Sequence, residues 1–398
     1  MTSPASPDTD VPWFEPPLSW LRAKHGVKWA RYGSEMLPAW VADMDFPVAP
    51  VIRQALADQL ERGDVTYPDW QFGPHPLAEP FAARMSARFG WQPDPHEVRG
   101  IADLISGLQI LLGLTTEPGD GVVLQDPNYP PFRNTVPAMG RAPIRLPLTF
   151  QDGHWRHDFD RLENLADAKV LLLVNPHNPT GAALEREELL RLAEFADRHD
   201  LLVICDEIHA DLVHDPNQHV PFAGLSPEIA SRTVTLTSAT KAFNIAGLRA
   251  AVAHLGSAAV RRRWDSQPPE MHGVMNVMGV EATRVAWEQG DDWLAGVRAH
   301  LLQQRGRLAA AVAEMPGVSL RLPDATYLAW LDCSGAELGE DAGQFFRRVA
   351  KVRMSPGPDF GGGPEMVRCN FATSTEVLDL ITTQIRKALI GSGSVIRR

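Results

Sequence analysis

The chain has 398 residues, of which 44% are hydrophobic and 22% are charged. This composition is that of an ordinary soluble globular protein, long enough for two or three domains. The formal net charge of −11 argues against a nucleic-acid or anionic-membrane partner, because such partners favour a basic face. No stretch of the sequence approaches the roughly 20 apolar residues of a membrane span.

The N-terminal residues 1–17, MTSPASPDTDVPWFEPP, are rich in proline and lack both a basic start and an apolar run. We therefore predict a poorly ordered arm rather than a signal peptide. Three cysteines, at positions 205, 333 and 369, are widely spaced and make no metal-ligand pattern. This cysteine usage predicts a reducing, cytoplasmic compartment.

The middle of the chain repeats a short apolar run, then turn residues, then a helical stretch. The four runs are GVVLQ (121–125), KVLLLV (169–174), LLVIC (201–205) and TVTLT (233–237). Residues 185–200, between the second and third runs, have apolar residues at helical spacing. Apolar runs that alternate with helices are typical of a mainly parallel α/β sheet.

After about residue 285 the pattern changes. Residues 286–315 predict one or two helices, which shorter strand-like pieces and a last helix at about 375–390 follow. This order is typical of a smaller α+β domain. We therefore predict an N-terminal segment (1–50) that packs with the small domain, a large domain (51–288) and a small C-terminal domain (289–398).

An unusual polar residue follows each of the four apolar runs, namely Tyr129, Asn178, Asp206 and Lys241. In parallel sheets ligands bind beyond the carboxyl ends of the strands, so these four residues predict one site. Lys241 is one of only six lysines and stands among small and apolar neighbours. It is either a lysine whose ammonium reaches solvent or a partly desolvated amine that forms a Schiff base.

NPHNPTG, the aspartate of ICDEIH and SATKAFNIAGLR together resemble the fold-type I, class I/II aminotransferase superfamily of pyridoxal-phosphate enzymes. The resemblance runs from about residue 38 to residue 372. LPAWVADMDFPVAP, TYPDW and DEIHADL resemble its MalY/PatB branch of cystathionine β-lyases and C–S lyases. It implies a large domain with a mainly parallel, seven-stranded-type sheet flanked by helices, plus a smaller α+β domain.

The resemblance also implies roles around the cofactor, pyridoxal 5′-phosphate. Lys241 matches the Schiff-base lysine that later removes the substrate Cα proton, and Asp206 would keep the pyridine nitrogen protonated. Asn178 matches the partner of the ring 3-oxygen, and Tyr129 the ring that stacks on the pyridine. The structural alternatives are a helix N-cap for Asp206, an Asn-Pro turn for Asn178 and a core tyrosine for Tyr129.

The cofactor phosphate is expected between two parts of the chain. Ser238 and Arg249 match the family's phosphate-binding serine and arginine. The backbone N–H groups of Asp103, Leu104 and Ile105 would add to them at a helix start, although GIADLISGL departs from the small-residue loop common in aminotransferases. Tyr67 matches a tyrosine that reaches the phosphate of a neighbouring subunit, which implies a homodimer; its alternative is a turn-packing role.

The resemblance places an amino-acid substrate against Arg368, which would hold the α-carboxylate bidentately, near Asn178 and the backbone at Ala42. A strand-edge salt bridge is the alternative for Arg368. Many aminotransferases carry a tyrosine where this chain has His209, which is also counted among the cofactor contacts and matches the C–S lyase branch. Some C–S lyases have a second tyrosine where this chain has Pro130.

The cluster of carboxylates and histidines between residues 206 and 215 follows no closed metal-ligand spacing, so we predict no metal. Two activities share the cofactor contacts: β-elimination from a cysteine thioether, which gives a thiol, pyruvate and ammonia, and amino transfer. A catalytically silent regulatory protein is a third reading, which the intact Lys241, Asp206 and Arg368 disfavour. WVADMDF, TYPDW and DEIH favour the lyase.

Overall fold

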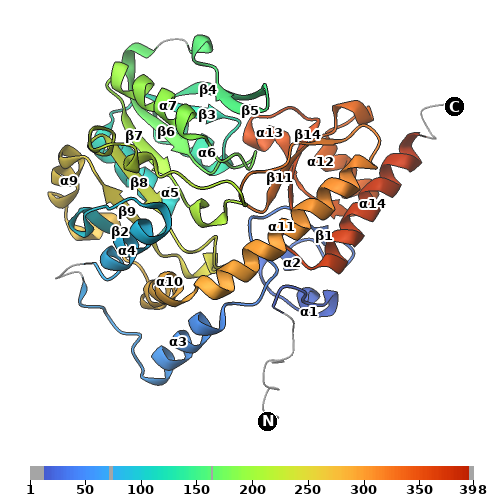
Figure 1. Ribbon diagram of the computed structural model, residues 1–398, viewed down its shortest axis with the longest axis horizontal. Helices are drawn as coiled ribbons and strands as arrows, with labels where there is room; N and C mark the ends of the chain where they lie inside the picture. The colour runs from blue at the N-terminus through green and yellow to red at the C-terminus, as the bar shows by residue number, and fades with distance from the viewer. Residues whose placement is uncertain (1–12, 71–74, 163–164, 394–398) are drawn as a thin grey trace.

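The computed structural model describes residues 13–70, 75–162 and 165–393, and its two larger sheets lie side by side (Figure 1). The larger sheet has eight strands in the order β2-β9-β8-β7-β6-β3-β4-β5. The strands are β2 (Val98–Ile101), β3 (Gly121–Asp126), β4 (Ala142–Gln151), β5 (His154–His157), β6 (Ala168–Val174), β7 (Leu202–Asp206), β8 (Thr233–Thr237) and β9 (Ala251–Leu255). The predicted mainly parallel α/β sheet is confirmed, since six of the eight strands run in one direction and only β9 and the edge strand β5 run in the opposite one.

The central strands are buried on both faces because successive side chains point to opposite sides of the sheet. In β3, Val122 and Leu124 join one core cluster, while Val123 joins another on the opposite face. Helices cover both faces: α5 (Leu104–Thr115), α6 (Pro130–Ala138) and α9 (Ala258–Asp265) pack on the first cluster, and α7 (Arg186–Arg198) packs on the second. The helix predicted at residues 185–200 is therefore confirmed as α7.

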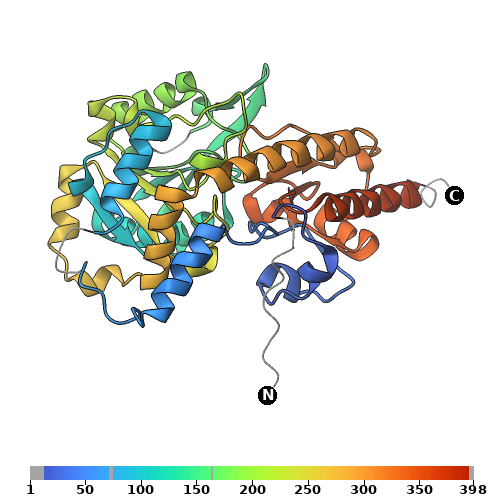
Figure 2. The same ribbon diagram turned by 60° about the horizontal axis from the view of Figure 1, so that its bottom comes forward.

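The smaller sheet is antiparallel, in the order β10-β11-β14-β13. Its strands are β10 (Ser319–Leu320), β11 (Leu328–Asp332), β13 (Ser355–Pro356) and β14 (Met366–Asn370), with the short helices α12 (Ala342–Phe345) and α13 (Gly357–Phe360). The helices predicted at 286–315 and 375–390 are α10 (Val277–Gln289) with α11 (Asp291–Ala313), and α14 (Thr375–Gly393). Figures 1 and 2 both show α11 and α14 side by side over this sheet.

The N-terminal segment joins the C-terminal part of the chain through β1 (Leu37–Pro38), which pairs with β12 (Val352–Arg353). Upstream of it, Phe14 contacts Phe46 edge to face with ring centroids 5.5 Å apart. The Glu15 carboxylate accepts hydrogen bonds from the Thr375 backbone N–H and hydroxyl at 2.7 and 2.6 Å. The prediction of a poorly ordered arm is therefore wrong for residues 13–17, while residues 1–12 lie outside the described part of the chain.

The remaining α-helices are α1 (Leu18–Arg22), α2 (Val27–Ala30), α3 (Pro50–Glu61), α4 (Ala78–Phe89) and α8 (Pro227–Ala230). No helix within the described ranges has both the length and the apolar character needed to cross a membrane. The three cysteines are free and buried. The domain boundaries near residues 50 and 288 stay a prediction.

Candidate active site

Lys241 lies in the turn that follows β8 and is partly buried. Its Nζ atom donates a hydrogen bond to the Ala42 carbonyl at 2.8 Å. Burial is the main effect on the Lys241 amine and lowers its pKa, and the charge of Arg368 lowers this pKa further. The charges of Asp43 and Asp206 raise it, but by less. The amine therefore points into the protein, which rejects the reading of a lysine whose ammonium reaches solvent.

Asp206 is the last residue of β7 and is buried. Its Oδ1 atom accepts a hydrogen bond from the Ile208 backbone N–H at 2.9 Å, while Oδ2 accepts none from the described residues. Burial raises the pKa of the Asp206 carboxyl to about 7, even though the Ile208 N–H and the Lys241 charge both oppose the shift. A carboxylate in this position would be stabilised by a cationic partner at its second oxygen.

Arg368 lies on β14 and is buried without a carboxylate partner among the described residues. Its Nη1 atom donates to Asn178 Oδ1 at 2.9 Å, and its Nη2 atom donates to the Trp40 carbonyl at 2.7 Å. Burial lowers the pKa of the guanidinium to about 10, so that it stays charged at neutral pH. The strand-edge salt bridge is therefore not present, and a buried unpaired guanidinium favours an anionic ligand.

Two aromatic side chains lie within reach of these charges. Tyr129 stands just before α6, where burial raises the pKa of its phenol and the charges of Arg368 and Asp206 act on it. His209 is buried, and its Nδ1 atom has no hydrogen-bond partner in the described residues. Burial, followed by the charges of Lys241 and Arg368, lowers the pKa of His209 to about 3, so its imidazole is neutral.

Most of the expected phosphate contacts lie at the N-terminus of α5. Asp103 caps the helix, because its Oδ1 atom accepts from the Ser106 N–H at 2.8 Å, and its Oδ2 atom pairs with Arg249. Leu104 and Ile105 occupy the first turn, where backbone N–H groups have no partner within the helix. Ser238 is engaged elsewhere, since its hydroxyl donates to the Ala250 carbonyl at 2.6 Å and must rotate to meet a ligand.

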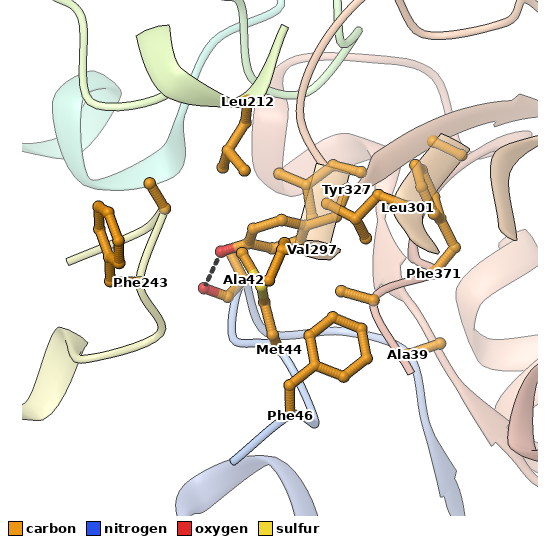
Figure 3. Close-up of a cluster of buried hydrophobic side chains, with 14 of the residues drawn as sticks. Ala39, Ala42, Met44, Phe46, Leu212, Phe243, Val297, Leu301, Tyr327 and Phe371 are labelled. Carbon is orange, nitrogen blue, oxygen red and sulfur yellow. Dashed lines mark hydrogen bonds between the residues drawn. The ribbon is translucent and has the colours of Figure 1, made fainter. Parts of the chain in front are cut away.

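The crossing segment, residues 40–46, is held over this site by residues that no sequence motif predicted. Asn244 Nδ2 donates to the carbonyls of Met44 and Phe46, each at 3.0 Å, and its Oδ1 atom accepts from the Met44 N–H at 2.9 Å. From the small sheet, Asn370 Nδ2 donates to the Val41 and Asp43 carbonyls, both at 2.7 Å. The Tyr327 hydroxyl donates to Ala42 at 2.8 Å (Figure 3).

Tyr67 is 97% exposed, and no contact joins it to the other candidate residues within the described chain. Leu60, Val65, Met271 and Val274 are also exposed, by 61%, 51%, 66% and 69%. A cavity of about 560 Å³ connects the two stretches, since Pro68 and Trp70 line it together with Val274 and Met275. Tyr67, Leu60, Val65, Met271 and Val274 are thus large side chains that the described part of the chain leaves uncovered.

The polar cluster between residues 206 and 215 has other partners. Glu207 pairs with His219 at 3.1 Å, Asp211 with Arg84 at 2.9 Å, and Asp215 with Arg298 at 2.8 Å. His214 Nε2 lies 2.7 Å from the Thr326 carbonyl. Among the residues described, no three histidine, cysteine or acidic side chains are grouped so as to hold a metal ion.

Similarity to known proteins shows the family of the chain. The model of the family "Aminotransferase class I and II" matches residues 41–385. The chain belongs to this family. It is 34% identical to a cystathionine beta-lyase of Corynebacterium glutamicum, over 92% of this chain and 96% of the relative. It is also 34% identical to the cystathionine beta-lyase PatB of Bacillus subtilis, over 91% and 96% of the two chains.

Solved structures show the same architecture. The PLP-bound C–S lyase of Staphylococcus hominis superposes with a TM-score of 0.86 at 28% identity, covering 93% of this chain and 97% of that one. The predicted MalY/PatB-like membership and the fold are thus confirmed.

Proposed function

We propose that this protein is a pyridoxal-phosphate-dependent C–S β-lyase that cleaves cystathionine or a related cysteine thioether to a thiol, pyruvate and ammonia. The observation that carries the proposal is the buried, unpaired Arg368 beside a desolvated Lys241 amine and a buried Asp206 carboxyl. The names of the relatives from Corynebacterium glutamicum and Bacillus subtilis support the lyase over the aminotransferase.

The side chains present fit the cofactor. Asp206 Oδ2 is the acceptor that a protonated pyridine nitrogen needs, and the unpartnered Nδ1 atom of His209 suits a ring substituent. Asn178 Nδ2 is the donor for the ring oxygen, because its Oδ1 atom is already used by Arg368. The first turn of α5 and the Arg249 guanidinium supply positive charge for a phosphate.

Pyridoxal phosphate supplies an aldehyde that condenses with amines and a ring that accepts electrons from the substrate Cα. Within that frame Lys241 acts as the base, because burial raises the fraction of neutral amine at neutral pH. Arg368 holds the α-carboxylate in a planar, bidentate contact, which fixes the rotation of the substrate about its N–Cα bond. Lys241 then removes the Cα proton as sulfur leaves Cβ.

The test is product analysis with cystathionine and the protein loaded with pyridoxal phosphate. A lyase forms pyruvate and a thiol without an added oxo acid. The alternative, an aminotransferase, turns over only when an oxo acid is supplied. Turnover that requires an added oxo acid and forms neither pyruvate nor a thiol would reject the lyase.

The proposal includes a homodimer in which Tyr67 of one copy completes the site of the other. An almost fully exposed tyrosine, together with the exposed side chains of Leu60, Val65, Met271 and Val274, supports it, because exposed apolar side chains are stabilised by burial against a second copy. The proposed compartment is the cytoplasm, which the three buried free thiols support.

A further inference from the structure

A second site lies on the small-sheet side of the molecule, outside the candidate active site. It is a groove of about 760 Å³ lined by four cationic side chains, Arg347, Arg348, Lys351 and Arg353, and by three acidic ones, Glu340, Asp341 and Asp359. Arg348 pairs with Glu340. Within the described chain the other three have no carboxylate within 4.0 Å, although acidic residues outnumber basic ones in the sequence, 49 to 38. Arg347 and Lys351 are exposed and Arg353 is half-buried, so an anionic ligand would stabilise the charge of Arg353 most.

The ring of Tyr32 lies beside two of these cations, Arg347 and Arg353, and we call the site the Tyr32 groove. The guanidinium carbons of Arg347 and Arg353 lie 5.4 and 5.5 Å from the ring centroid, and that of Arg31 lies 5.9 Å away. Arg353 Nε is buried and has no acceptor among the described residues. Burial raises the pKa of the Tyr32 phenol, but hydrogen bonds and charge from Arg353 and then Arg31 outweigh this effect and lower it.

The Tyr32 groove is connected to the substrate side of the active site through Trp40. The rings of Tyr32 and Trp40 meet edge to face with centroids 5.4 Å apart. The Trp40 carbonyl accepts hydrogen bonds from Arg368 Nη2 at 2.7 Å and from the Ser355 hydroxyl at 2.9 Å. Arg353 stands opposite Pro38 in the β1–β12 ladder, and Ser355, two residues later, stands opposite Arg368 in the β13–β14 ladder.

We propose that the Tyr32 groove binds the carboxylate of a small organic acid, at a position separate from the α-carboxylate site at Arg368. Planar guanidinium groups match carboxylates in geometry as well as in charge. The carboxylate has two possible sources: the far end of the thioether substrate, or a free acid that binds beside it. The substrate source rests on the proposed lyase function, whereas the binding site does not.

The experiment is calorimetric titration of the full-length, cofactor-loaded protein with glutarate, with the neutral glutaramide as the matched control ligand. We expect glutarate to bind and glutaramide not to. Arg353→Gln should weaken binding roughly tenfold or more, the loss of one charge-assisted pair. Arg347→Gln, at an exposed position, should weaken binding in the same direction if Arg353→Gln folds poorly. Arg348→Gln, whose arginine is already paired, should change the affinity less than twofold.

Tyr32 supplies a second readout, because the sequence contains only four tyrosines and burial raises the pKa of Tyr129 and Tyr327. Bound glutarate adds negative charge beside the Tyr32 phenol, so its ultraviolet titration should shift to higher pH, and Tyr32→Phe should abolish the shift. Failure of the wild-type protein to bind glutarate, or equal losses in Arg353→Gln and Arg348→Gln, would overturn the proposal.

The source of the carboxylate is settled by comparing S-carboxyalkyl and S-alkyl cysteines as substrates. A preference in kcat/KM for the carboxylated thioether that Arg353→Gln removes assigns the groove to the substrate. Glutarate binding without that preference assigns it to a free acid. Glutarate binding with no turnover of either thioether rejects the lyase function and leaves the carboxylate site standing.

Discussion

Asp206 is a buried carboxyl whose raised pKa weakens the fold. Since its pKa is about 7 in the folded protein against 3.8 for the ordinary group, its neutral form is favoured. The folded protein is therefore favoured while the Asp206 carboxyl is protonated. This stabilisation is fully present below about pH 4 and is lost as the pH rises through 7. Asp206→Asn keeps an acceptor for the Ile208 N–H and removes the charge.

We expect cofactor-free Asp206→Asn to be about 2–4 kcal/mol more stable than the parent at pH 8. The difference should shrink steadily as the pH falls towards 5. Denaturant unfolding at several pH values measures it. Turnover of the loaded variant should fall at least about 100-fold, because the ring nitrogen loses its anionic partner. Equal stability at pH 8 would show that the carboxylate is already compensated in the fold.

Lys241 is expected to be the covalent attachment point. Borohydride treatment of the cofactor-loaded protein, followed by peptide mapping, should label the peptide that contains Lys241. Lys241→Ala should abolish the label and most turnover, whereas Lys169→Ala, at an exposed lysine on β6, should keep both. A label on any other lysine contradicts the assignment.

At the scale of elements, the N-terminus of α5 carries a carboxylate where an anion is expected. Asp103→Asn preserves the helix cap, because asparagine caps as well as aspartate, and releases Arg249 from its ion pair. We expect pyridoxal phosphate to bind about 3- to 10-fold more tightly, from the lost repulsion and the freed guanidinium. Equilibrium fluorescence titration measures the affinity.

The matched control for this change is Asp94→Asn, at an exposed cap that accepts from the His96 N–H at 2.9 Å. This variant should leave cofactor affinity unchanged. Weaker binding by Asp103→Asn would mean that Asp103 orients Arg249 for the phosphate instead of competing with it.

The turn after β8 depends on Asn244, which adopts a left-handed conformation with φ of 56°. Asn244→Gly removes three hydrogen bonds to the crossing segment and should cost about 2–4 kcal/mol. Asn244→Ala should cost about 1 kcal/mol more, because alanine disfavours this conformation. Chemical denaturation of both variants separates the loss of the hydrogen bonds from the strain of the left-handed backbone. Equal stabilities of the two variants would show that backbone strain is unimportant here.

The sequence predicted those elements and site residues whose signal is local. The four apolar runs became β3, β6, β7 and β8 because hydrophobic residues fill both sheet faces. Lys241 and Asp206 stood out because each is a polar residue soon after an apolar run of the sequence. Asn244, Tyr327 and Asn370 did not, because each holds backbone some 200 to 330 residues away, a distance that no local pattern encodes.

For the whole molecule, the expected assembly is a dimer with shared sites. When inactive Tyr67→Ala and Lys241→Ala proteins exchange subunits, hybrid dimers should contain one intact site, so that activity returns. Mixing either variant with itself serves as the control. A fully active monomer in sedimentation experiments would contradict shared sites.

The crossing segment also determines when during synthesis the enzyme can become competent. Its hydrogen bonds join Ala42 to Lys241, 199 residues later, and Val41 to Asn370, 329 residues later. The ribosome therefore releases the segment long before its final partner exists, while the larger sheet can already form. Val41 and Asp43, whose carbonyls accept from Asn370, must wait until β14 emerges. A nascent chain that stops short of Asn370 would hold the lysine and the aspartate but lack the closed substrate site.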